Sequence, residues 1–223
     1  MSRDPQAAAA FLDGWAAELA AAGWGEPERH EPTTLQLAMN GWTRPQAPDP
    51  TGHPARSMTD PQGRVVATIE AETGDPYASL IEVRPLAIVE GRRPAWWVSA
   101  VGPLPTSLLA AVVEAAASPA APGPEAFAEH LERDGRWFLE GQDYDEERNL
   151  IERRWSTYTK DCDCGFAAPG EENGPHAGWT VSRENPDDPD RRRQRIDLPV
   201  STPAAVVAAV ALAAIPAPVA EPA

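Results

Sequence analysis

The sequence predicts an α+β protein of two tandem units, each with the order helix, three strands, helix. An internal repeat carries this prediction, because residues 96–116 and 194–214 match at a constant offset that places Pro105 on Pro203. Similarity at a fixed spacing indicates one supersecondary unit used twice. In each unit the strands lie between an opening and a closing helix, and that order favours antiparallel sheets with helices packed on one face.

Proline-rich stretches place the boundaries of the two units. We expect the first unit over residues 1–118, a linker over 119–124, the second unit over 125–215 and a disordered tail over 216–223. The linker contains three prolines and a glycine, a composition that favours an extended connection. The chain has 223 residues, so each unit has about 100 residues, near the usual size of a domain.

The first unit begins with a helix over 5–22, in which Phe11, Trp15 and Leu19 form one apolar stripe and Pro5 suits the first turn. Strands are indicated where apolar and polar residues alternate. The other elements expected in this unit are a short strand at 35–39, a proline-rich loop at 44–63, strands at 64–72, 79–89 and 96–101, and a helix at 105–118.

The second unit repeats this order after the linker. Acidic and proline-rich stretches separate its strands, and a helix rich in alanine and valine closes it. The elements expected here are a helix at 125–133, strands at 150–160, 178–184 and 194–200, and a helix at 203–215.

The charge of the chain argues against several classes of partner. Its formal net charge is −15, and a net-negative surface repels phosphate backbones and anionic membranes. The basic cluster at 191–193 directly follows the acidic stretch 187–190. The apolar run 203–215 is too short to span a bilayer, and two cysteines are too few for a disulfide framework. We therefore expect a cytoplasmic protein that binds neither nucleic acid nor membrane directly.

Two motifs in the first unit resemble a known family. Residues 57–65, Ser-Met-Thr-Asp-Pro-Gln-Gly-Arg-Val, place a turn before a strand, and residues 94–98, Pro-Ala-Trp-Trp-Val, precede a segment that begins Pro-Thr-Ser-Leu-Leu at 105–109. These motifs resemble the DUF317 (SPDY) repeats of streptomycetes, best over 40–118 and more loosely over 137–215. The resemblance implies a tandem architecture and an actinobacterial origin. Since the family has no known function, the resemblance implies no catalytic residues.

One cluster in the second unit has the residue types of a metal site. Cys162 and Cys164 are separated by one residue, His176 follows, and Asp161 precedes them. Thiolates and imidazole suit zinc, although structural zinc sites usually take paired cysteines two residues apart. The alternative interpretation is a polar loop in which two thiols happen to lie close together.

Four tryptophans are candidates for an interaction surface. Trp96 and Trp97 are adjacent on an expected strand, so their side chains point to opposite faces. One indole then fills the core, and the other reaches the opposite face. Trp155 and Trp179 are the corresponding candidates in the second unit. Tryptophan is enriched in binding hot spots; the alternative is that the other unit or a loop covers these side chains.

Function is constrained by the motifs that the sequence lacks. It contains no phosphate-binding loop, no dinucleotide fingerprint and no nucleophile elbow, so an enzyme is not favoured and no cofactor is expected. We expect a non-enzymatic accessory protein of an actinobacterium, its phage or a mobile element, with another protein as its partner. Two alternatives stay open. One is an acidic inhibitor that mimics nucleic acid, and the other is a metal-dependent binder or enzyme built on Cys162, Cys164 and His176.

Overall fold

The computed structural model describes residues 3–21, 32–44, 57–72, 75–86, 96–102, 104–115, 123–170, 173, 177–184 and 193–215. The chain divides into two compact units, Met1–Ala117 (unit 1) and Ser118–Ala223 (unit 2). The described residues form an α+β fold in which all strand pairs within each unit are antiparallel. None of the described helices is long and apolar enough to cross a membrane.

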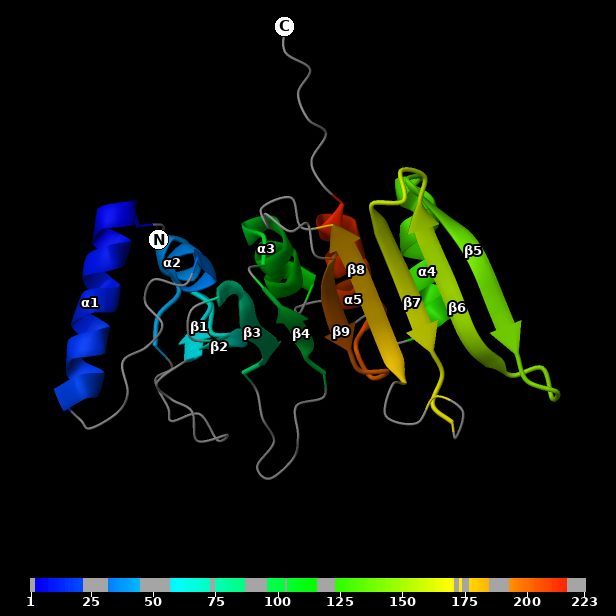
Figure 1. Ribbon diagram of the computed structural model, residues 1–223, viewed down its shortest axis with the longest axis horizontal. Coiled ribbons are helices and arrows are strands. Elements are labelled where there is room, and N and C mark those ends of the chain that lie inside the picture. The colour runs from blue at the N-terminus through cyan, green and yellow to red at the C-terminus, as the bar shows by residue number, and fades with distance from the viewer. Residues whose placement is uncertain are drawn as a thin grey trace, which may run out of the picture. The chain divides into compact units, whose positions relative to one another are not determined.

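Unit 1 contains a sheet of four strands in the order β1-β2-β3-β4 (Figure 1). Its first helix begins at Pro5, where the carboxylate of Asp4 accepts a hydrogen bond of 2.8 Å from the backbone N–H of Ala7 and so caps the first turn. The elements of this unit are α1 (Pro5–Ala21), α2 (Pro32–Met39), β1 (Ser57–Thr59), β2 (Val65–Glu72), β3 (Asp75–Pro85), β4 (Val98–Val101) and α3 (Thr106–Ala115).

Unit 2 contains a sheet of five strands in the order β9-β8-β7-β6-β5, and both of its helices lie on one face of that sheet (Figure 1). Helix α5 packs on β7 and β8, and α4 packs on β5 and on α5. The elements of this unit are α4 (Pro124–Asp134), β5 (Trp137–Tyr144), β6 (Leu150–Thr157), β7 (Cys162–Ala167), β8 (Gly178–Glu184), β9 (Arg193–Leu198) and α5 (Ala204–Ala214).

Four expected helices and six expected strands are confirmed, within a few residues at their ends. The helices are α1, α3, α4 and α5, and the strands are β2, β3, β4, β6, β8 and β9. The expected tail at 216–223 lies outside the described residues, as does most of the expected linker at 119–124.

The strand expected at 35–39 is wrong, because this segment belongs to helix α2. Pro32 occupies the first helical turn, where its fixed φ is favourable. Thr34, Leu37 and Ala38 are buried, and their spacing of three and four residues is that of a helix. The alternation of Leu35, Leu37 and Met39 therefore does not reflect which residues of this segment are buried.

The expectation of three strands in each unit is also wrong. The described part of unit 1 contains β1 in addition, and unit 2 contains β5 and β7 in addition. Strand β1 falls within the stretch 44–63, which its prolines had marked as a loop. Strand β5 pairs only with β6 among the described strands, and its register shifts between Leu139 and Gly141 and again between Asp143 and Tyr144.

Aromatic side chains form the core of unit 2. The ring of Phe127, on α4, lies with its centroid 4.9 Å from Trp155 and 4.8 Å from Trp179. Phe166 lies 4.6 Å from Trp179 on the same side of the sheet. The contacts of Phe127 fix α4 against β6 and β8, since aromatic pairs at such distances add to the free energy of burial.

A buried carboxylate organises the turn between β1 and β2. The side chain of Asp60 accepts hydrogen bonds from the backbone N–H groups of Gln62 (3.1 Å), Arg64 (2.5 Å) and Val65 (2.8 Å). Asp60 is 2% exposed. Its hydrogen bond to Val65 is buried, and those to Gln62 and Arg64 are partly buried. Gly63 takes a φ of 67° in the same turn, a value that suits glycine.

We expect Asp60→Ala to lower the free energy of unfolding by about 2–4 kcal/mol, because it leaves the buried N–H of Val65 and two partly buried N–H groups without this acceptor. Urea denaturation followed by circular dichroism measures this. Asp145→Ala is the matched control, since Asp145 bonds to the backbone and side chain of Asn149 in an exposed turn and its loss is expected to cost under about 1 kcal/mol. Equal losses in the two variants would contradict the role assigned to burial.

Candidate functional site

The face of the unit 2 sheet that points away from α4 and α5, here called the open face, is the candidate functional site (Figure 1). Side chains alternate along each strand, so β7 sends Cys162, Cys164 and Phe166 into the core and the side chains between them to the open face. The strand register aligns the open-face residues in two rows: Ser156, Asp163, Ser182 and Arg195 in one, and Arg154, Gly165, Thr180 and Asp197 in the other.

The open face is hollowed into a groove of about 400 Å³. Three small residues on adjacent strands, Ser156, Gly165 and Thr180, lie along it. A Cβ atom placed on Gly165 would meet no atom within 4 Å, so the space above this glycine is free. The groove is lined by Glu140, Glu152, Arg154, Trp155, Ser156, Lys160, Asp163, Cys164, Gly165, Thr180 and Arg193.

Ion pairs hold the charged side chains at the groove. Lys160 Nζ lies 2.7 Å from Glu140 Oε1, and Arg193 Nη2 lies 2.6 Å from Asp163 Oδ2. The hydrogen bond and charge of Lys160 hold the pKa of Glu140 below its usual value. Arg154 contacts Glu152 at a longer distance of 3.5 Å. Exposed pairs of this kind contribute little to stability, so their main effect is to fix where each charge lies.

Lys160 has an unusual backbone conformation at one end of the groove. Its φ is 62°, in the left-handed region that disfavours residues with a Cβ. Its ammonium lies 4.8 Å from the centre of the Phe138 ring, and the Phe138 ring lies 5.1 Å from that of Tyr158. The Glu140 ion pair and the aromatic contact together hold this strained residue in place.

The structure places the candidate metal ligands in different surroundings. Cys162 and Cys164 are buried on the helix side of β7, and Cys162 Sγ donates a hydrogen bond of 3.3 Å to the carbonyl of Ala214. Asp161 accepts hydrogen bonds from the hydroxyls of Thr157 (2.7 Å) and Thr159 (2.6 Å). His176 lies outside the described residues. No three His, Cys, Asp or Glu side chains group as a metal site within the part of the chain that the structure describes.

Burial also keeps both thiols protonated. Removal from water raises the pKa of Cys162 to about 12, with a further contribution from the charge of Asp161. Burial raises the pKa of Cys164 strongly as well, and Asp163 adds to that effect. Burial alone would raise the pKa of Asp161, but hydrogen bonds from Thr159 and Thr157 outweigh it and lower that pKa. Since the thiolate is the form that binds metal and attacks electrophiles, these cysteines pack as small apolar side chains.

Three of the four candidate tryptophans lie in the core. Trp96, Trp155 and Trp179 are buried, whereas Trp97 is half-buried. Among the described residues of unit 2, the exposed large apolar side chains are instead Leu139, Tyr144 and Tyr158, on β5 or just after β6. Sequence reasoning gave these no weight, and it also missed the groove. The signal for the groove was the polar or small residue at every second position of β7.

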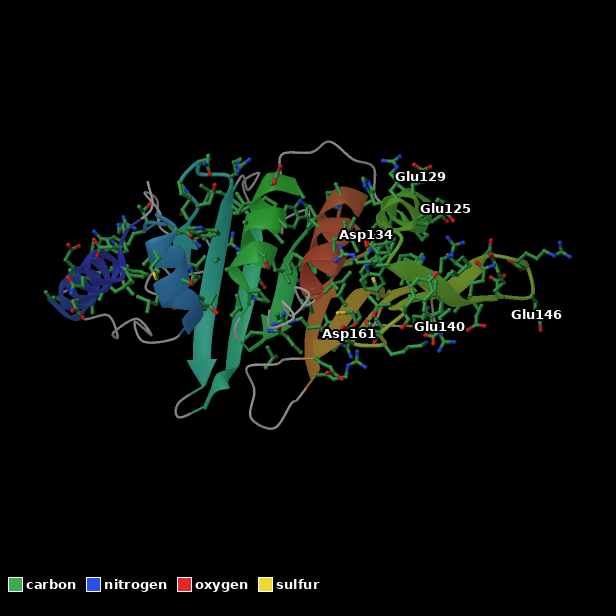
Figure 2. All side chains as sticks on the ribbon, turned by 90° about the horizontal axis from the view of Figure 1, so that it is seen from above. Glu125, Glu129, Asp134, Glu140, Glu146 and Asp161 are labelled. Carbon is green, nitrogen blue, oxygen red and sulfur yellow. The ribbon has the colours of Figure 1, made fainter. Side chains whose placement is uncertain are left out.

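The acidic residues of unit 2 point in several directions. Figure 2 shows Glu125 and Glu129 on α4, Glu140 on the other side of the sheet and Glu146 at the tip of the β5–β6 hairpin. On the open face itself, carboxylates alternate with arginine and lysine. This face is therefore of mixed charge and does not form a stripe of carboxylates.

No family model, curated protein or solved structure matches this chain. The resemblance to the DUF317 repeats therefore stays a prediction.

A pH titration of stability tests the protonated state of Cys162. Its pKa is raised on folding, so the stabilisation is present below the unfolded pKa of about 8.5 and is lost as pH rises toward the folded value. Above about pH 9 we expect the unfolding free energy of the native chain to fall more steeply than that of Cys162→Ala, by about 1.4 kcal/mol per pH unit. Parallel curves up to pH 10.5 would contradict this.

Substitutions of Lys160 separate backbone strain from side-chain contacts. Lys160→Ala and Lys160→Gly both remove the ion pair and the ring contact, but only the glycine relieves the positive φ. We expect the glycine variant to be more stable than the alanine variant by about 1 kcal/mol, as measured by urea denaturation. An alanine variant as stable as the glycine variant would show that the strain is absent.

Proposed function

We propose that this chain is a non-enzymatic interaction protein that binds another protein through the open face of unit 2. The observation that carries the proposal is the groove on this face, whose charged side chains are already positioned by ion pairs. Positioned side chains lose little entropy on binding, and that favours a specific contact. Tyr158, which is 72% exposed, lies beside the groove residue Lys160 and adds a side chain of the kind that anchors interfaces.

The charge of the groove favours a protein over a nucleic acid. Three carboxylates (Glu140, Glu152 and Asp163) and three cations (Arg154, Lys160 and Arg193) line it, so the lining carries no net charge. A phosphate backbone needs a basic surface, while the chain as a whole carries −15. A nucleic-acid mimic needs a row of carboxylates without cations between them. On this face carboxylates are paired with cations, and that pairing does not favour a nucleic-acid mimic.

The same ion pairs argue against acid–base catalysis at the groove. A general acid that works near neutral pH needs a carboxyl pKa raised toward that pH. Lys160 lowers the pKa of Glu140, which keeps that carboxylate ionised. The buried, protonated thiols likewise give the metal-dependent alternative no support from Cys162 or Cys164.

We also infer that the two units are divergent copies of one unit. Met58 pairs with Ala67 in unit 1 as Trp155 pairs with Cys164 in unit 2. In the turns that follow, Gly63 and Lys160 both have a positive φ and both donate to the residue three positions earlier, at 2.9 and 3.0 Å. These matches support the tandem arrangement and, with the DUF317-like motifs, an accessory protein of an actinobacterium, its phage or a mobile element that acts in the cytoplasm.

Substitutions that fill the groove test the proposal. Gly165→Phe places a large side chain in free space, and Gly170→Phe does the same on a loop outside the groove. We expect a partner in lysate of the native host to be captured by the native chain and by Gly170→Phe, and to be lost with Gly165→Phe. If all three proteins capture the partner equally, or if none of them captures a partner, the assignment of the open face as the binding surface is overturned.

A further inference from the structure

We infer that the groove of unit 2 receives an extended, net-neutral peptide segment of the partner protein. This inference rests on the proposed function and adds the chemical class of what is bound. Two observations carry it: the size and floor of the groove, and the balance of its charges.

The strand registers define which positions of the two sheets are equivalent. When Met58 is aligned with Trp155, strands β1, β2 and β3 of unit 1 correspond to strands β6, β7 and β8 of unit 2. Each open-face residue of these unit 2 strands then has an equivalent residue in unit 1 with the same strand partners. Arg154 then corresponds to Ser57, Ser156 to Thr59, Asp163 to Val66, and Ser182 to Arg84.

Four positions of the equivalent face in unit 1 are buried. Ser57, Thr59, Val66 and Arg84 are 0, 7, 2 and 2% exposed. In unit 2 the side chains of Arg154 and Asp163 are instead 55 and 44% exposed, although Ser156 is buried as Thr59 is. Two further positions of that face in unit 1 are only half-buried. They are Thr68, which corresponds to Gly165, and Glu82, which corresponds to Thr180 and has a side chain that is 42% exposed. The two copies therefore differ most at the places of Arg154 and Asp163.

The dimensions of the groove suit a single extended chain. Its volume of about 400 Å³ is near the lower end of the range for binding cavities, too small for a folded element. Its floor of Ser156, Gly165 and Thr180 lets a backbone come close to the sheet. An extended segment directs every second side chain to the same side, so it would place alternate side chains between the ion pairs.

The charges select a neutral occupant. Each groove cation lies 2.6–3.5 Å from a carboxylate, so a strongly acidic or basic segment would have to break a pair to be bound. Backbone amides and uncharged polar side chains such as serine, threonine, asparagine and glutamine can bond to both members of a pair and leave it intact. Binding of this kind depends little on salt, because it releases no counterions.

The probe for this inference is a library of random linear peptides displayed on phage and selected on the full chain. Selected peptides are then synthesised and titrated against the native chain, Gly165→Ala, Gly165→Phe and Gly170→Phe. We expect peptides of near-zero net charge that bind the native chain, Gly165→Ala and Gly170→Phe alike. With Gly165→Phe we expect a loss of affinity of about tenfold or more. Thermal melting curves that overlay that of the native chain show that each variant is folded.

Three results would overturn the inference. In the first, the selected peptides bind Gly165→Phe as tightly as the native chain. In the second, the selected peptides are strongly charged and their affinity falls steeply as salt is added. In the third, the selection yields no binding peptide. A host partner that is lost with Gly165→Phe, but of which no linear segment binds, would show that the groove meets a folded surface. In that case the proposed function stands and the inference about the peptide fails. A host partner that ignores the groove altogether removes the proposed function itself.

Discussion

The packing of Phe166 on strand β7 against Trp179, a ring that Phe127 also contacts, is the interaction on which the rest of unit 2 depends. β7 lies between β6 and β8 in the middle of the five strands, and its buried side, Cys162, Cys164 and Phe166, meets the aromatic core. A strand with one side fixed in a core has no freedom to slip by one residue, because that would exchange its two faces. The position of Gly165 on the open face is therefore set by the burial of its neighbours.

Helix α4 is tied to the same core from the other direction. Its Phe127 and Leu131 are buried, and Glu125 at its start lies 3.6 Å from Arg153 on β6. The guanidinium of Arg153 in turn lies 5.9 Å from the Trp155 ring. The helix ends at Gly135, whose φ of 73° gives the left-handed turn that closes a helix. Both ends of α4 are thus fixed, and the chain enters β5 in a defined direction.

The sequence predicted four of the helices and six of the strands because their patterns are local. An apolar stripe, a proline in the first turn and a two-residue alternation depend only on neighbouring residues. The strands that were missed show where local patterns are insufficient. β7 alternates correctly, but two of its three buried positions are cysteines, which drew attention as metal ligands when they are core residues. β5 has two register shifts, and these interrupt the alternation that marks a strand.

The candidate site was less accessible to sequence reasoning than the fold. Residues of the groove come from β5, β6, β7, β8, β9 and the turn between β6 and β7, so only the pairing of strands brings them together. The tryptophans were chosen for their chemistry, yet Trp155 and Trp179 are buried since each is on the helix side of its strand. Whether an aromatic residue is core or surface depends on the face it occupies, and that face is decided by the sheet.

The irregular register of β5 has a consequence for how the protein behaves at high concentration. A sheet margin with a regular row of free N–H and C=O groups is a template on which further chains can assemble into aggregates. The shift after Leu139, where β5 carries the extra acidic residue Glu140, interrupts that row, and the shift after Asp143 places an extra residue, Ile151, in the neighbouring strand β6. Another molecule finds no continuous ladder along this margin, so the unit resists the edge-to-edge growth that leads to fibrils.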